Sequence, residues 1–235
     1  MRMRFKPWAR PELEESFFYI DNPQDYKNKW KTAFENEAPI YLELGCGKGS
    51  FIAKLSHQNP NINYIAIDLV DVMLGMAKRN VEVEYGIRTT TDKEEIEDEV
   101  EKGKQVKNLK LVRYDIARVK DIIGPEDKID RIYINFCNPW PRGKHHKRRL
   151  TYDKNLINYK SFLSDDGKIF FKTDNDELFD ESLKYFEKAQ YKIEKKTYDL
   201  ASEEKFWDGE DNLKTEHEKM FEADGIKIKA LIASK

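Results

Sequence analysis

The sequence is poor in the residues and segments that mark secreted, membrane-spanning or disulfide-stabilised proteins. Its only cysteines are Cys46 and Cys137, too few for a disulfide framework or a four-thiolate zinc site. No apolar run approaches the roughly 18 residues that span a bilayer. The basic N-terminus is not followed by the apolar stretch of a secretory signal. We therefore expect a protein of the reducing cytoplasm with no membrane contact.

The sequence also lacks a net charge of one sign. Lys and Arg number 42 against 44 Asp and Glu, so the formal charge is −2, although 37% of the 235 residues are charged. The charges are segregated: residues 142–149 hold five basic residues and two histidines without an acid, and residues 92–101 hold seven acids and one lysine. We interpret residues 142–149, called the basic strip below, as a phosphate-binding segment. We interpret the acidic run as a solvated face or loop.

Short apolar runs alternate with helical spacing from residue 40 onward. Strands are predicted at 40–44, 64–67, 109–112, 129–136, 168–172, 191–198 and 226–232, and helices at 50–55, 70–81, 152–163 and 178–186. This alternation predicts βαβ units, a mainly parallel sheet and helices on both of its faces. The fold class is therefore α/β.

The domain organisation follows from composition. Residues 1–36 are interpreted as an N-terminal basic arm and a leading helix near residues 25–34, and residues 37–235 as one domain. Residues 84–108 are polar and highly charged, and they are much longer than the usual connection between a helix and a strand. We expect them to form a charged surface insertion that is partly helical through the acidic run.

A glycine-rich turn follows the first predicted strand directly. Gly45, Gly47 and Gly49 permit a sharp turn and a close approach of a ligand to the backbone. Asp68 ends the next strand, where a carboxylate can accept hydrogen bonds from both ribose hydroxyls. Because the turn begins with an acid, Glu43, it favours a cationic cofactor such as S-adenosylmethionine over a dinucleotide. The structural alternative is a tight turn from strand to helix with no ligand.

A stiff loop follows the strand at 129–136. It reads Asn138-Pro-Trp-Pro141 and leads directly into the basic strip. The prolines stiffen the backbone, an amide can contact a base edge, and Trp140 can stack on a base or simply pack. We expect this loop at the sheet edge that also carries the glycine turn.

At this point the sequence resembles the bacterial tRNA (guanine-N7-)-methyltransferase family. The matching segments span most of the chain in the expected order; they are Met1–Trp8, Leu42–Gly49, Asn135–Pro141, His145–Thr151, Phe171–Asp174 and Thr215–Glu218. The resemblance implies a class I S-adenosylmethionine-dependent, Rossmann-like sheet of seven mostly parallel strands with the last one antiparallel. It implies methylation of N7 of a tRNA guanine, at guanosine 46 of the variable loop.

The resemblance also implies roles for individual residues. The implied cofactor contacts are Glu43, Gly45, Gly47, Gly49, Asp68, Asp115 and Asn138. The implied substrate contacts are Arg142, Asp174, Thr215 and Glu218, and the charge pattern adds Lys147, Arg148 and Arg149 as phosphate ligands. Asp174 could accept from the guanine N1–H and N2–H edge, or cap a helix, and Asp115 could contact adenine or cap a helix.

The chain departs from the family at two places. The family usually has Asp, proposed as catalytic, where this chain has Asn138, and most members lack so long a segment at 84–108. Guanine N7 carries a lone pair and no proton, so no general base is required. We therefore expect Asn138 to position its ligand while supplying less electrostatic stabilisation than a carboxylate.

Other functions remain open at the level of sequence. Asn138-Pro-Trp-Pro141 is similar to the motif of methyltransferases that act on exocyclic amino groups, and a non-catalytic RNA-binding module with this fold is a second alternative. A nicotinamide dehydrogenase is disfavoured by Glu43. We expect no metal site, because His145 and His146 have no third ligand at metal spacing. The expected partner is tRNA, and the expected assembly is a monomer or a homodimer.

Overall fold

The computed structural model describes residues 4–93, 96, 98–207 and 212–235. Contacts between Cα atoms divide the chain into two units, Met1–Ile123 and Gly124–Lys235. Each unit has its own strands, its own covering helices and its own buried apolar side chains. Among the residues described, no helix is both long and apolar enough to cross a membrane.

The first unit contains four parallel strands. They are β1 (Tyr19–Ile20), β2 (Ile40–Leu44), β3 (Asn63–Asp68) and β4 (Leu109–Arg113). Their spatial order is β1-β4-β3-β2, with Leu42 opposite Ile65 and Ala66 opposite Leu111. These strands are nearly continuous runs of buried residues, as expected for parallel strands covered on both faces. The strands predicted at 40–44, 64–67 and 109–112 are confirmed.

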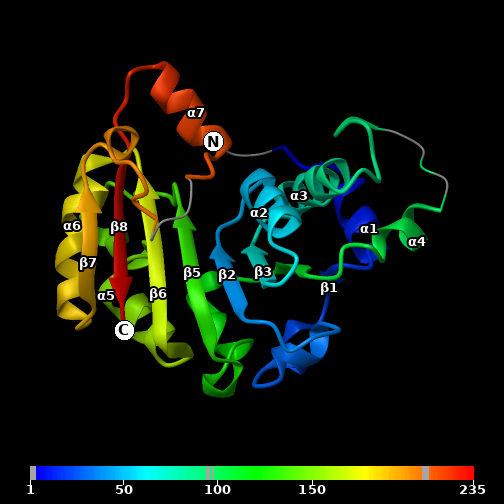
Figure 1. Ribbon diagram of the computed structural model, residues 1–235, viewed down its shortest axis with the longest axis horizontal. Helices are drawn as coiled ribbons and strands as arrows, with labels where there is room; N and C mark the ends of the chain where they lie inside the picture. Colours follow the sequence, from blue (N-terminus) through cyan, green and yellow to red (C-terminus); the bar gives the residue numbers. More distant parts are fainter. Residues whose placement is uncertain (1–3, 94–95, 97, 208–211) are drawn as a thin grey trace. The chain divides into compact units, whose positions relative to one another are not determined.

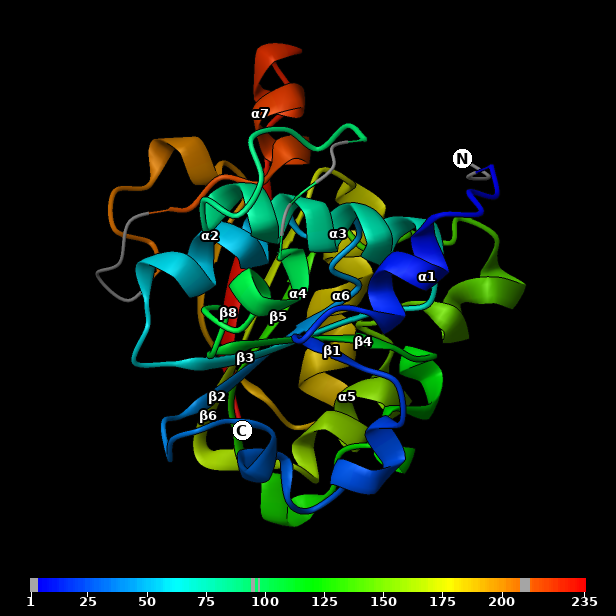
Figure 2. The same cartoon turned by 90° about the vertical axis from the view of Figure 1, so that its right-hand side faces the viewer.

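Three α-helices of the first unit pack side by side (Figure 2). Helix α2 (Ser50–Gln58) contacts α3 (Asp71–Glu84), and α3 also contacts α1 (Ala9–Glu14). The spacing predicted α2 and α3, whereas α1 and the two-residue β1 were not predicted. Strand β1 pairs with β4 and is one strand more than the seven that the resemblance implies.

The helix predicted near residues 25–34 is wrong. Two separate 3-10 turns, Pro23–Tyr26 and Trp30–Ala33, replace it. Asn28 lies between them with a φ of 63°, a left-handed conformation that interrupts any helix. The apolar residue that suggested a helix is Trp30, which is buried. The Trp30 indole N–H donates to the Ile122 carbonyl at 2.7 Å. These residues therefore cover the unit without forming a helix of their own.

The segment 84–108 is partly anchored in the interior, which corrects the interpretation of its acidic run as a solvated face or loop. Glu99, at the start of α4 (Glu99–Gly103), pairs with the buried Lys78 and with Arg88 at 2.9 Å. Glu82 pairs with both cations as well, at 2.5 and 3.0 Å. Residues 94, 95 and 97 of the acidic run lie outside the described residues. Glu99 therefore helps to neutralise two cations that would otherwise be buried at considerable cost.

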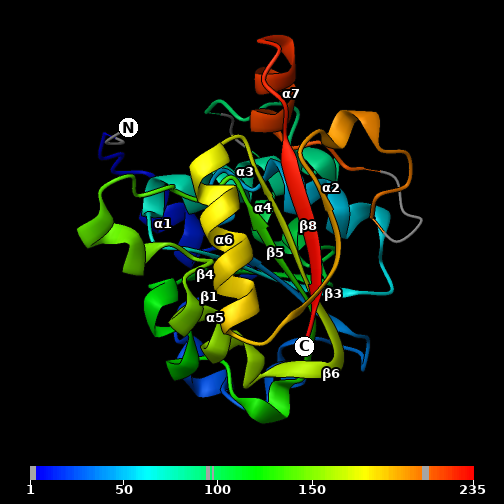
Figure 3. The same cartoon turned by 90° about the vertical axis from the view of Figure 1, so that its left-hand side faces the viewer.

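The strands of the second unit are partly parallel and partly antiparallel (Figures 1 and 3). They are β5 (Ile129–Asn135), β6 (Leu163–Thr173), β7 (Lys192–Thr197) and β8 (Lys229–Ser234), in the order β5-β6-β8-β7. Strands β5 and β6 are parallel, and β8 runs antiparallel to both β6 and β7. The expectation of an antiparallel last strand is confirmed.

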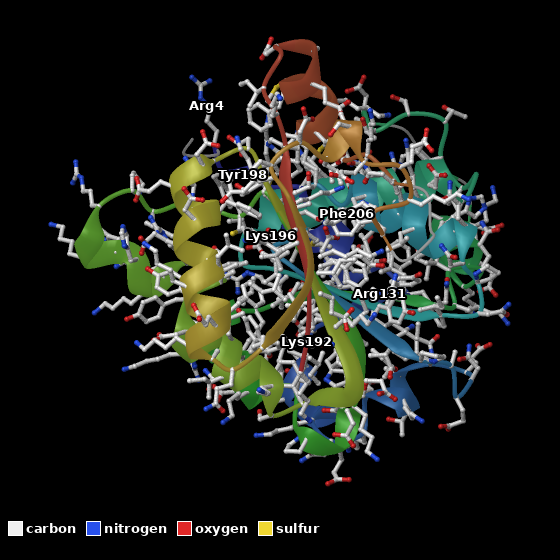
Figure 4. The ribbon with its side chains drawn as sticks, turned by 60° about the vertical axis from the view of Figure 1, so that its left-hand side comes forward. Arg4, Arg131, Lys192, Lys196, Tyr198 and Phe206 are labelled. Carbon is white, nitrogen blue, oxygen red and sulfur yellow. The ribbon has the colours of Figure 1, made fainter. Side chains whose placement is uncertain are left out.

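Helices α5 (Asp153–Lys160) and α6 (Asp176–Lys188) contact each other, and α6 packs on β6, β7 and β8. Buried Leu178, Phe179 and Phe186 form the inner face of α6. Strand β7 is the edge of this sheet, and Lys192 and Lys196 project from it (Figure 4). Charged side chains on an edge strand discourage pairing with another chain.

Candidate functional site

The glycine turn, residues 43–49, adopts the conformation that its composition predicts. Gly45, Gly47 and Gly49 all have positive φ values, of 80°, 56° and 70°. The N–H groups of Gly45 and Cys46 donate to the Ile67 carbonyl at 2.9 and 3.1 Å, which ties the turn to β3. A Cβ atom added at Gly47 would meet nothing within 4 Å. The backbone at Gly47 is therefore open to the approach of a ligand.

Asp68, at the end of β3, braces this turn. Its Oδ2 accepts from the Gly47 N–H at 3.0 Å, and its Oδ1 accepts from the Val70 N–H at the same distance. Burial raises the pKa of the Asp68 carboxyl above its usual value, against the lowering effect of these hydrogen bonds. The structure thus brings the turn and the acid of the second strand together, as the sequence predicts.

The glycine turn lies in a negative electrostatic environment. Glu43, on β2, is only 2% exposed. Burial, Asp68 and Glu43, in that order of effect, raise the pKa of the Cys46 thiol. Two carboxylates close enough to disfavour a thiolate also attract a cation. This environment suits a sulfonium cofactor better than a pyrophosphate.

Two apolar side chains beside Asp68 escaped the sequence analysis. Leu69 and Val70, which directly follow Asp68, are 50% and 41% exposed. Leu69 and Val70 together could cover the flat face of an adenine ring. The available signal was an apolar pair just past the end of a strand, where a polar loop is usual.

Gly49 is the turn residue least tolerant of substitution. Its φ is 70°, and an added Cβ would lie 2.5 Å from the Cβ of Ala77 on α3. We expect Gly49→Ala to lower the free energy of unfolding by about 2–4 kcal/mol, because backbone strain adds to a steric clash. Urea unfolding measures this loss. Gly47→Ala is the matched control, because it introduces the same backbone strain without a steric clash. If both variants lose the same free energy of unfolding, the clash with Ala77 contributes nothing.

Asp115 follows β4 and serves as a helix cap in this structure. Its Oδ1 accepts from the Ala117 N–H at 3.0 Å, at the start of the 3-10 segment Ile116–Asp121. The capping alternative therefore describes what Asp115 does here. Its contact with adenine stays a prediction.

The loop after β5 is organised by Asn138. The Asn138 Oδ1 accepts from the Trp140 N–H at 3.0 Å, and Trp140 has the unusual φ of 43° for a bulky residue. The Trp140 ring stacks on His145 with centroids 5.9 Å apart, and the Arg148 guanidinium lies 5.1 Å from the ring centroid. The Asn138 side chain thus fixes the residue whose ring contacts the basic strip.

The basic strip forms the 3-10 segment Gly143–Arg148 and exposes most of its cations. Arg142, Lys144, Lys147 and Arg148 are exposed, as a phosphate-binding role requires. Arg149 is different, because it is 1% exposed. Its Nε donates to the Pro139 carbonyl at 2.7 Å, and its Nη2 donates to Glu177 at 3.0 Å. The expectation that Arg149 binds phosphate is therefore replaced by a role in holding the Asn138–Pro141 loop.

Asp174 lies at the end of β6, next to the start of α6. The cap of α6 is Asn175, whose Oδ1 accepts from the Leu178 N–H at 2.7 Å. The capping alternative for Asp174 is therefore wrong. The Asp174 carboxylate makes no hydrogen bond or ion pair to the residues that the structure describes, so it is available to a ligand.

Thr215 and Glu218 differ from the expectation that they face the substrate. The Thr215 hydroxyl accepts from the Glu218 N–H at 3.0 Å and caps α7 (Glu216–Ala223). Glu218 is 0% exposed, and its carboxylate pairs with the Lys172 ammonium at 2.6 Å and accepts from the Asn212 amide. Both side chains are therefore committed to the interior of the second unit.

Relatives with curated names match this chain along its whole length. The tRNA (guanine-N(7)-)-methyltransferase of Clostridium beijerinckii is 54% identical over 235 residues, which cover 100% of this chain and 99% of the relative. The enzymes of that name from Clostridium perfringens and Acetivibrio thermocellus are 52% and 44% identical, each with 100% of both chains covered. A family model described as a putative methyltransferase matches residues 37–231.

The chain belongs to the tRNA (guanine-N7-)-methyltransferase family. Solved structures support the α/β methyltransferase fold: an antibiotic-related methyltransferase covers 94% of this chain and 98% of its own, with a TM-score of 0.57 at 17% identity. The 16S rRNA methyltransferase KamB covers 99% of this chain and 94% of its own, with a TM-score of 0.52 at 13% identity. At such low identity these two structures show the fold alone.

The N-terminal arm of this family member is held against α3. The Trp8 ring lies 3.7 Å from the Arg79 guanidinium, which also pairs with Glu12 at 2.6 Å. Arg10 of the arm pairs with Glu14 at 2.6 Å and with Asp21. Arg4 and Lys6 remain exposed, and Arg2 lies outside the described residues.

A metal site finds no support in the described ranges of the chain. No group of three or more His, Cys, Asp and Glu side chains is arranged there to hold an ion. His146 lies 3.0 Å from Arg149 Nη2 and 3.7 Å from Glu177, and His145 stacks on Trp140. These contacts give both histidines structural partners within the second unit.

Proposed function

We propose that this family member transfers the methyl group of S-adenosylmethionine to N7 of a guanine in tRNA, and that the target is guanosine 46 of the variable loop. The observation that carries the proposal is full-length identity of 54% to a relative of that name. The glycine turn braced by Asp68 and the exposed cations of the basic strip are consistent with it.

The first unit would hold the cofactor. Asp68 would accept from the ribose hydroxyls, and Leu69 with Val70 would cover the adenine. The negative charges of the buried Glu43 and the half-buried Asp68 would favour the cationic cofactor over its neutral thioether product. When bound, the cofactor supplies the electrophilic methyl group.

The second unit would bind the tRNA. Arg142, Lys144, Lys147 and Arg148 would contact phosphates, and the free carboxylate of Asp174 would accept from the guanine N1–H and N2–H groups. The bound cofactor would supply its methyl group to the N7 lone pair, and the carbon–sulfur bonding electrons would remain on sulfur. No proton is removed, so the protein needs to orient the base and to tolerate its new positive charge.

The decisive experiment uses labelled S-adenosylmethionine and unmodified tRNA. Label should enter the tRNA, and borohydride followed by aniline should cleave it at guanosine 46, because this chemistry cuts at 7-methylguanosine. Label without cleavage would favour the amino-group methyltransferase. Absence of both label transfer and calorimetric cofactor binding would favour a non-catalytic RNA-binding module.

Glu43→Gln tests the electrostatic basis of cofactor binding. The variant keeps the shape of the side chain and removes one buried negative charge, so we expect it to weaken S-adenosylmethionine binding roughly tenfold, the equivalent of about 1.4 kcal/mol. Titration calorimetry measures this change. The loss should be smaller for S-adenosylhomocysteine, which lacks the sulfonium, and equal losses would indicate a role unrelated to that charge.

Asn138→Ala tests the loop. The variant loses the hydrogen bond from the Trp140 N–H, which contributes about 1–1.5 kcal/mol to holding the loop in place. If that free energy is lost from the transition state, turnover should fall roughly tenfold. Asn138→Asp is the matched control, because it keeps the acceptor and adds a carboxylate that can stabilise the positive base. Its turnover should equal or exceed that of the wild type. Wild-type turnover in Asn138→Ala would remove the positioning role.

A further inference from the structure

The Trp140 ring carries a cation on its surface. The Arg148 guanidinium carbon lies 5.1 Å from the centroid of the ring, within the range of cation–π attraction. Trp140 is only partly buried, and Arg148 is exposed, so one side of this contact borders solvent. The local geometry therefore presents an indole face that accepts a planar, delocalised cation.

We propose that this face of Trp140 binds the methylated guanine as a cation, and that Arg148 occupies its place in the free protein. The inference rests on the proposed function and deepens it. It makes Trp140 a residue that discriminates the charged product, and the transition state leading to it, from the neutral substrate base.

The chemistry of the reaction gives the indole this preference. N7 uses its lone pair to bond the methyl carbon, the carbon–sulfur electrons go to sulfur, and the base changes from neutral to cationic without losing a proton. A neutral guanine gains only stacking from an indole, whereas 7-methylguanine also gains the attraction of a cation for the ring quadrupole. An interaction that grows as charge develops lowers the barrier instead of merely tightening substrate binding.

The position of Trp140 is set by its neighbours. The Asn138 side chain holds its N–H, His145 stacks on its ring, and the buried Arg149 holds the Pro139 carbonyl next to it. Within the described part of the chain, Arg148 makes no hydrogen bond or ion pair; it is exposed and reaches the ring from the end of the 3-10 segment. A tRNA phosphate that attracts Arg148 would therefore uncover the indole without moving the loop.

The test compares the affinities of two tRNAs, with and without 7-methylguanosine, for the full chain saturated with S-adenosylhomocysteine. The wild type should prefer the methylated tRNA. Trp140→Leu should reduce that preference roughly 2- to 30-fold, the range of a cation–π contact, and Trp140→Phe should retain part of it. Trp140→Leu should also lower kcat more than it raises KM.

The control is Arg148→Ala. It should weaken the binding of both tRNAs and reduce the salt dependence of that binding. The preference for the methylated tRNA should be unchanged, because the indole stays in place. Equal losses for both tRNAs in Trp140→Leu would overturn the proposal and leave Trp140 as a support for the loop.

Fluorinated tryptophans, introduced at position 140 alone by nonsense suppression, cover the case in which Trp140→Leu fails to fold. Fluorine withdraws electron density from the ring with little change of shape, so each added fluorine should lower the preference stepwise. A preference independent of fluorination would overturn the proposal. If the wild type forms no 7-methylguanosine in the labelling experiment, the proposed function fails first, which separates the two failures.

Discussion

Replacing Glu218 with alanine is expected to lower the free energy of unfolding by about 3–5 kcal/mol, because the change leaves the buried Lys172 ammonium without its anionic partner. The Lys172 side chain is 3% exposed, and its Nζ lies 2.6 Å from the Glu218 carboxylate. Asn212 donates to the same carboxylate, and the Trp207 indole N–H donates to Asn212 at 2.9 Å, so both belong to the same cluster. Urea unfolding followed by circular dichroism measures the loss.

Two further variants separate a structural from a substrate-binding role of Glu218. Lys172→Met combined with Glu218→Leu removes both charges, so it should recover much of the stability that Glu218→Ala loses. Thr215→Ala should cost only about 1 kcal/mol, as a lost helix cap. Glu218→Ala with unchanged stability and abolished tRNA binding would show that Glu218 faces the substrate after all.

Removing three exposed cations of the basic strip is expected to weaken tRNA binding on the order of 100-fold at low salt. The variant carries alanine at Arg142, Lys147 and Arg148, which are all exposed. Each lost phosphate contact should reduce the slope of log affinity against log salt concentration by about 0.7–0.9, so the slope should fall by about 2–3. Filter binding across a salt series measures both quantities.

The matched control removes the same number of charges elsewhere in the second unit. Lys154, Lys192 and Lys196 are exposed, and the last two lie on the edge strand β7 (Figure 4). Alanine at these three positions should leave the slope close to that of the wild type. If the slope falls equally in both triple variants, tRNA binding depends on the overall charge of the protein and the basic strip has no special role. Arg149→Ala should act differently, by lowering stability, because Arg149 is buried.

Local pattern was sufficient for most of the architecture. Strands β2 and β3 are short buried apolar runs, and their ends are marked by Gly45 and Asp68. Steric rules that act within a few residues determine such features, so the turn with positive φ values could be predicted. Its hydrogen bond from the Gly47 N–H to Asp68, 21 residues away, depends on the pairing of β2 with β3 and was not predicted. The helix expected at 25–34 was wrong for a different reason, because apolar spacing does not show that Asn28 adopts a left-handed conformation.

The roles of charged residues could not be predicted in this way. Arg149 lies within a run of cations, and sequence alone treats it as one more phosphate ligand, yet its partner Glu177 is 28 residues away on α6. Lys172 and Glu218 are 46 residues apart, and Glu99 lies in an acidic run that composition describes as solvated.

The sequence by itself therefore determined the α/β class, the family, the glycine turn and the position of the basic strip along the chain, because each depends on local pattern or on shared motifs. Only the tertiary structure decided which charges are buried and which side chains are free for a ligand. Burying a charge is favourable only beside a compensating group, and long-range folding alone brings that group into contact.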